Sequence, residues 1–124
     1  MNSLTLSRLP HTWLIDVDGT ILRHNGHLQG CDELLPGVKA FWEAIPGEDV
    51  VVLLSARKEE ERATTLDFMQ KHKLRVDYAI FGLPKGERVL INDLKPRGMN
   101  TAMALNVPRD HGLVSISITL SDSI

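Results

Sequence analysis

The sequence lacks several features that define large classes of proteins. It has one cysteine, Cys31, so no internal disulfide can form, and a reducing cytoplasm is the compartment that fits best. It has no long basic run, and 14 basic against 16 acidic residues give a net charge of −2, which does not favour nucleic-acid binding. No stretch approaches the ~18 apolar residues of a membrane span, and the first residues lack the apolar core of a signal peptide. We therefore expect a cytoplasmic protein with neither nucleic acid nor membrane as a partner.

Length and composition indicate one globular domain. A chain of 124 residues with 43% hydrophobic and 24% charged residues is ordinary for a soluble protein. A domain of this size buries about two thirds of its unfolded surface. The sequence shows no internal repeat, low-complexity tract or linker. We therefore treat residues 1–124 as a single domain.

Short apolar segments predict the strands of a sheet. WLIDVDGTI, residues 13–21, begins as a strand whose apolar residues indicate burial on both faces, as in a parallel sheet. Residues 101–107, TAMALNV, predict a fifth strand or a segment that begins as a helix. Residues 113–120 alternate apolar residues with serine and threonine, like an edge strand. The remaining predicted strands are VVVLL (50–54), YAIFG (78–82) and RVLIND (88–93).

Helical patterns separate these strands. Pro36 is suited to the first turn of a helix, and the spacing of Val38, Phe41, Trp42 and Ile45 gives that helix one apolar face. A second helix begins with three glutamates at 59–61 and ends with basic residues at 71–73, which complements the helix dipole. Strands alternating with helices predict a doubly wound, Rossmann-like α/β domain with a parallel sheet. Ligands of such domains bind beyond the carboxyl ends of the strands.

Polar residues fall at these carboxyl ends. Asp16 and Asp18 end the first predicted strand, Ser55 ends the second, and Asp93 ends the fourth after Asn92. Lys85 lies in the loop that leads into the fourth strand. The opposite edge of the sheet shows no comparable pattern in the sequence. The sequence therefore predicts that carboxylates, a hydroxyl and an amine meet at one edge.

This pattern resembles that of the haloacid dehalogenase-like phosphohydrolases. The segment DxDGT at Asp16–Thr20 looks like their first motif, and Ser55, Lys85 and Asp93 resemble the second, third and fourth in the right order. The likeness spans residues 12–107. GLPKGERVLINDLKP is also similar to small bacterial members linked to sugar-phosphate and surface-polysaccharide metabolism.

The resemblance implies a Mg²⁺-dependent phosphatase that works through an aspartyl-phosphate. Asp16 would be the nucleophile, and Asp18 the acid and base that Thr20 orients. A carboxylate can split hydrolysis into two easier steps, but bringing it to a phosphate dianion costs about 8 kcal/mol at 4 Å and a dielectric of 20. A magnesium ion held by Asp16, Asp93 and the Asp18 carbonyl would offset this repulsion. Lys85 and Ser55 would then bind the phosphate.

Several of these assignments have alternatives. Ser55 stands where a helix N-cap belongs, and Arg57 either reaches the phosphate or only solvates the helix start. Asn92 precedes Asp93 where many relatives carry a second acid, which leaves one ligand position neutral. His24, His27 and Cys31 have spacings that could hold zinc, but a fourth ligand is not nearby. The cations that could replace Lys85 at the phosphate are Lys73, Arg88 and Lys95.

Two other functions and one absence complete the interpretation. A phosphoacceptor receiver module uses similar residues, but its phosphorylated aspartate ends the third strand, where this chain has YAIFG. A catalytically silent domain is the remaining alternative. Only 17 residues separate Asp18 from Pro36 and seven separate Phe81 from Val89, too few for the roughly forty residues of a cap domain. We therefore expect an open pocket without a cap domain, a sugar phosphate as one candidate substrate, and a homo-oligomer that supplies a lid.

Overall fold

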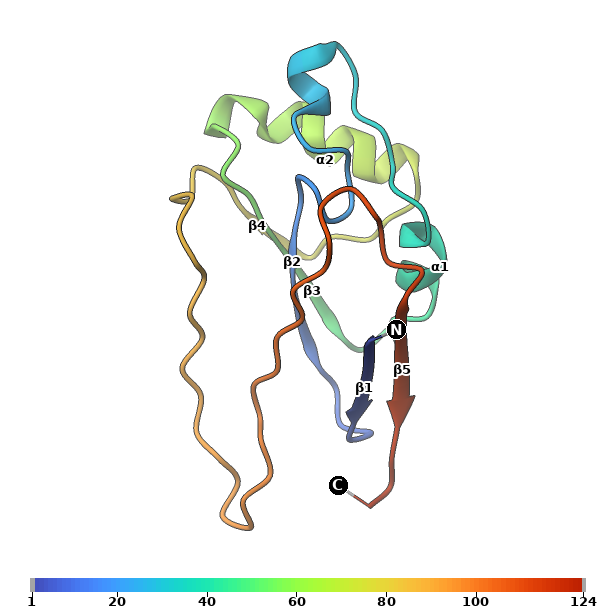
Figure 1. The fold of residues 1–124 in the computed structure, drawn as a ribbon, viewed down its shortest axis with the longest axis vertical. Helices are drawn as coiled ribbons and strands as arrows, with labels where there is room; N and C mark the ends of the chain where they lie inside the picture. The colour runs from blue at the N-terminus through green and yellow to red at the C-terminus, as the bar shows by residue number, and fades with distance from the viewer. Residues whose placement is uncertain (1, 124) are drawn as a thin grey trace.

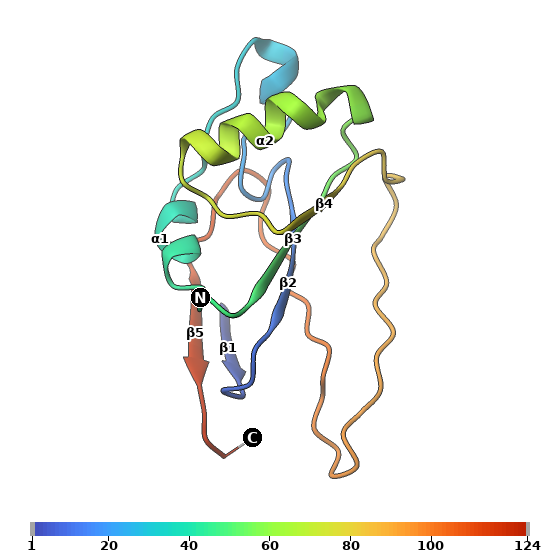
Figure 2. The same ribbon diagram turned by 180° about the vertical axis from the view of Figure 1, so that it is seen from behind.

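The computed structural model describes residues 2–123 and is shown in Figure 1 and, from behind, in Figure 2. The fold is α/β with parallel strands. Its elements in chain order are β1 (Asn2–Leu6), β2 (Thr12–Asp16), the 3-10 turn η1 (Gly26–Gln29), α1 (Val38–Glu43), β3 (Val50–Leu54), the 3-10 turn η2 (Glu59–Glu61), α2 (Arg62–Lys71), β4 (Tyr78–Ile80) and β5 (Ile116–Leu120).

Three of the predicted strands form one parallel sheet. The order is β2-β3-β4, with Asp16 opposite Leu54 and Leu54 opposite Ile80, so the carboxyl ends of these strands are level. β1 and β5 pair in parallel as a separate two-stranded sheet. The prediction of an edge strand near the end of the chain is thus confirmed. The single doubly wound sheet is not observed, because the parallel strands are divided between two small sheets.

The two predicted helices cover one face of the larger sheet. Val38 and Trp42 of α1 and Met69 of α2 form one buried cluster with Val51 and Leu53 of β3. The spacing of apolar residues therefore predicted the packing face of α1 correctly. No helix among residues 2–123 is long and apolar enough to cross a membrane.

The opposite face of this sheet is open. Leu14, Tyr78 and Ile80 point to that side and are 47%, 66% and 47% exposed. The prediction that the first strand is buried on both faces is therefore wrong for β2. An apolar residue indicates that a strand can be buried, whereas burial also requires another element to lie on that face.

Residues 84–107 form a long arm without helix or strand, which leaves the body and returns to it in both views (Figures 1 and 2). The strands predicted at 88–93 and 101–107 are absent from it. Val89 and Ile91 are 81% and 89% exposed rather than buried. Bonds at the tip, including Lys95 N–H to Met99 O at 3.0 Å, join its two legs. A strand needs a neighbour as well as an apolar sequence, and these legs do not pair with β2.

The segment after the arm is held tightly against the start of α1. Gly112 has a φ of +78°, and a Cβ on it would lie 2.0 Å from the carbonyl oxygen of Pro36. The neighbouring Leu113 N–H donates to the same oxygen at 2.8 Å. Only glycine permits this close approach. This contact brings the chain back over the carboxyl end of β2.

Candidate active site

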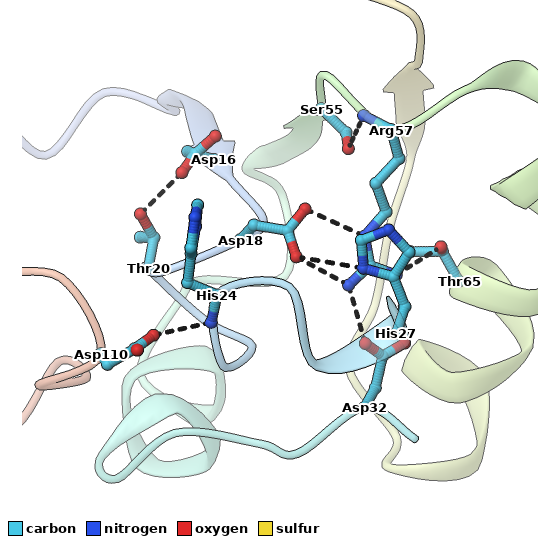
Figure 3. A network of polar contacts seen from close by, with 10 residues as sticks. All are labelled: Asp16, Asp18, Thr20, His24, His27, Asp32, Ser55, Arg57, Thr65 and Asp110. Atoms are coloured by element: carbon cyan, nitrogen blue, oxygen red, sulfur yellow. Dashed lines mark hydrogen bonds and ion pairs between the residues drawn. The ribbon is translucent and has the colours of Figure 1, made fainter. Parts of the chain in front are cut away.

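A tight turn after β2 separates the two predicted carboxylates. Ile21 N–H donates to Val17 O at 3.0 Å, and Gly19 N–H donates to Leu22 O at 2.7 Å. Gly19 has a φ of +83°, and a Cβ there would lie 3.2 Å from Cγ of Arg109. Figure 3 shows that Asp16 and Asp18 consequently point in different directions. The pair therefore occupies two distinct environments rather than one shared site.

Asp16 stands at the end of β2 and is accessible, with a side chain that is 36% exposed. Its Oδ2 accepts a hydrogen bond from Thr20 Oγ1 at 2.9 Å, and its Oδ1 accepts one from Arg88 Nη1 at 2.8 Å. Thr20 thus orients Asp16, whereas the resemblance had implied that it orients Asp18. Arg88, one of the alternative cations, is the one that reaches this carboxylate.

Asp18 is gripped by Arg57, which follows β3. Arg57 Nε donates to Asp18 Oδ2 at 3.0 Å and Nη2 donates to Oδ1 at 2.9 Å. His27 Nδ1 lies 3.8 Å from the same Oδ1, too far for a hydrogen bond. That nitrogen is buried and has no hydrogen-bond partner among the described residues. In this arrangement Asp18 accepts hydrogen bonds and faces away from Asp16.

Arg57 is almost fully buried, with a side chain 1% exposed. Burial would lower its pKa, but hydrogen bonds and charge from Asp18 and Asp32 outweigh that effect and raise the pKa of Arg57. A buried guanidinium of this kind is stable only because carboxylates pair with it. Arg57 therefore belongs to the site, but it contacts side chains of the protein. Its predicted contact with phosphate stays a prediction.

Ser55 is also at the predicted position, directly after β3, and is 1% exposed. Its Oγ accepts a hydrogen bond from the Arg57 backbone N–H at 3.0 Å. The N-cap reading is not realised in α2, because η2 begins at Glu59. In this arrangement the hydroxyl fixes the turn that carries Arg57, and phosphate binding by Ser55 stays a prediction.

A hollow of about 250 Å³ lies between the turn and the segment that returns from the arm. This volume is below the roughly 300–1,000 Å³ of pockets that enclose a small-molecule ligand, and it suits a group the size of a phosphate. The lining residues are Asp16, Asp18, Gly19, Thr20, Val107 and Arg109. Arg109 was missed in the sequence, since its proximity arises from contacts with a distant segment. One of these contacts is the bond from Asp110 N–H to Gly19 O at 2.8 Å.

Two predicted site residues are not brought to the hollow. Lys85 and Asp93 both lie exposed on the arm. Among residues 2–123 no group of three histidine, cysteine, aspartate or glutamate side chains is arranged to hold a metal ion. In this arrangement Asp16, Asp18 and Asp93 do not fit a magnesium ion, and His24, His27 and Cys31 do not form a zinc site. We derive no chemical step through a metal.

The amino ends of β2 and β3 carry a second buried polar network, contrary to the prediction that this edge has none. Asp49 is 3% exposed, and its Oδ2 accepts hydrogen bonds from Trp13 Nε1 at 2.8 Å and His11 Nδ1 at 2.9 Å. Burial would raise the pKa of Asp49, but the bonds from Trp13 and His11 outweigh it and hold that pKa below its ordinary value. His11 and Trp13 precede or begin a strand and gave no sequence pattern for such a network.

Comparison of the chain with models of protein families, with curated proteins and with solved structures found no match.

Proposed function

We propose that the protein is a Mg²⁺-dependent phosphatase that hydrolyses a phosphate monoester through an aspartyl-phosphate on Asp16. The observation that supports this most is the position of Asp16. It is an accessible carboxylate at the carboxyl end of a parallel strand, it lines a phosphate-sized hollow, and Arg88 donates to it. The resemblance of Asp16–Thr20 to the first motif of haloacid dehalogenase-like phosphohydrolases supports the same activity.

The proposed reaction has two steps. A carboxylate oxygen of Asp16 attacks phosphorus, the bond to the ester oxygen breaks, and the leaving oxygen takes a proton from Asp18. Asp18, now ionised, removes a proton from a water molecule that attacks the phosphorus of the aspartyl-phosphate. Phosphate leaves and the Asp16 carboxylate is restored. The hydrogen bonds from Arg57 suit Asp18 to the second step, in which it accepts a proton.

Cations near the hollow would reduce the repulsion between Asp16 and the phosphate. Arg88 already donates to Asp16 Oδ1, and Arg109 lines the hollow. A guanidinium matches the geometry of phosphate oxygens with two parallel hydrogen bonds. We propose that Arg88 moves from the carboxylate to the incoming phosphate. The requirement for Mg²⁺ remains part of the proposal, and loss of activity in a chelator would be its test.

The substrate class is the least constrained part of the proposal. A small hollow beside an exposed arm would hold the phosphate and leave the rest of the substrate outside. Sugar phosphates are the first candidates because of the likeness of residues 82–96 to small bacterial members of that family. A homo-oligomer in which a neighbouring subunit covers the hollow would exclude water from the reacting group.

Steady hydrolysis of p-nitrophenyl phosphate, followed by a panel of sugar phosphates, tests the activity. We expect Asp16→Asn to reduce kcat at least about 1,000-fold, because an amide does not attack phosphorus. Its thermal unfolding should stay close to that of the wild type, since Asp16 is partly exposed. A receiver-like module would instead take up one phosphoryl group from acetyl phosphate without steady turnover. A silent domain would do neither, and either result would contradict the proposal.

A further inference from the structure

Every donor of the Arg57 guanidinium is used within the protein. The group has five N–H bonds, and Figure 3 shows how the surrounding residues meet them. Asp18 accepts from Nε and Nη2, and Asp32 accepts from Nη1 at 3.1 Å and Nη2 at 2.7 Å. Thr65 Oγ1 accepts the remaining bond from Nη1 at 2.9 Å. Arg57 therefore has no free donor for a phosphate and holds one orientation.

Asp32 supplies the second edge of this arrangement. Asp18 meets the Nε/Nη2 edge of the planar guanidinium, and Asp32 meets the adjacent Nη1/Nη2 edge. A planar fork held by carboxylates along two edges can neither rotate nor swing. The Asp32 side chain is only 5% exposed, so this ion pair is screened little by solvent.

The backbone around Asp32 is itself held in place. The neighbouring Glu33 accepts a bond from Arg23 N–H through its carbonyl oxygen at 2.9 Å, and Leu35 N–H donates to Ile21 O at 2.9 Å. These bonds tie the segment containing Asp32 to the turn that carries Asp18. Asp32 is therefore fixed relative to Asp18, and Arg57 bridges the two.

We propose that Asp32 is a positioning residue, which holds Arg57 in the orientation that fixes the carboxylate of Asp18. This inference rests on the proposed function, in which Asp18 transfers the protons. Without Asp32, the guanidinium keeps one carboxylate and is free to turn, so Asp18 loses its fixed orientation. Substrate binding at Asp16 and Arg109 is not involved. The effect should therefore fall on kcat and spare KM.

Asp32→Asn tests this role, with Glu33→Gln as the matched control. Glu33 is the next residue and also pairs with an arginine, Arg23, but that pair is more than half exposed. We expect Asp32→Asn to lower kcat about tenfold with KM changed less than about twofold, and Glu33→Gln to change neither. The Arg57 Nε–H signal in ¹H–¹⁵N spectra should exchange slowly in the wild type and rapidly in Asp32→Asn.

Two further variants keep the outcome decisive. If Asp32 acts through Arg57, the double variant Asp32→Asn/Arg57→Lys should turn over no more slowly than Arg57→Lys alone. If Asp32→Asn does not fold, Thr65→Val removes one bond and no charge, and should lower kcat about threefold.

A folded Asp32→Asn protein with wild-type kcat, or an unchanged Nε–H exchange rate, would overturn the inference alone. If Thr65→Val has to stand in for it, wild-type kcat in that variant would overturn it equally. A wild-type protein that hydrolyses no phosphate ester would overturn the proposed function and the catalytic role of Asp32 together.

Discussion

The two ends of the sheet each carry a buried carboxylate that accepts several hydrogen bonds, yet they differ in what surrounds it. At the amino end, Asp49 is enclosed by His11 and Trp13, and Trp13 packs edge-to-face on Phe41 with ring centroids 5.7 Å apart. At the carboxyl end, Asp18 is held by Arg57 beside an open hollow.

The difference shows that a buried, well-bonded aspartate is not by itself a sign of catalysis. The network at Asp49 uses all of its visible polarity to connect β2 to the segment before β3, and opens on no hollow with a second carboxylate. The carboxyl end has Asp16, which keeps an accessible oxygen surface next to two arginines. We therefore assign stability to one end and chemistry to the other.

Removing Asp49 should give the largest effect and break the comparison on the side of stability. Asp49→Ala leaves the Trp13 and His11 donors without their acceptor in a buried site, and we expect a loss of about 3 kcal/mol in the free energy of unfolding. Urea unfolding measures it, with the exposed neighbour Glu48→Ala as control. Phosphatase activity of the folded variant should be unchanged. A large loss of kcat at a temperature where it is folded would contradict the division between the two ends.

Arg88 and Lys85 sharpen the comparison on the side of chemistry. Arg88→Ala removes the cation that contacts Asp16, and we expect kcat/KM to fall about tenfold, equivalent to about 1.4 kcal/mol. Lys85→Ala changes a side chain on the exposed arm and should alter kcat/KM less than about twofold. Parallel steady-state assays of the two variants decide between them. The reverse order would return the phosphate-binding role to Lys85.

The smallest effect concerns pH. The pKa of Asp49 lies below its ordinary value of 3.8 in the folded protein. Its contribution to stability is therefore fully present above that ordinary value and is lost as pH falls through the lower, folded value. The difference in unfolding free energy between wild type and Asp49→Ala should stay constant from about pH 7 to about pH 5 and narrow below about pH 3.8. Urea titrations across that range measure it, and a gap that narrows already between pH 7 and 5 would point to another group.

The sequence predicted the elements that depend on nearby residues. The strands at 50–54 and 78–80, the packing face of α1 and the acidic start of α2 all follow from local periodicity and end residues. The positions of Asp16, Asp18, Thr20, Ser55 and Arg57 near one edge follow from parallel strands ending level.

Other features depend on distant pairing, which local patterns do not encode. β1 was missed because its partner β5 is more than a hundred residues away. The apolar run Val89–Ile91 has the composition of a strand but no neighbour, so the predicted strand at 88–93 was wrong. Arg109 and Asp32 reach the site only through the folding of separate loops, and neither stood in a recognisable pattern.

The arm has a consequence for the connectivity of the molecule. Segments on both sides of it are joined without it: Asn2–Leu6 pairs with Ile116–Leu120, and Leu113 is bonded to Pro36. Residues 84–107 therefore work as a tether, and a protease that cut within them would sever the covalent chain without removing either fragment from the body. The hollow itself is shared between the two fragments, since Asp16 belongs to the first and Arg109 to the second. In that sense the chain is a single polypeptide whose site is built like an interface.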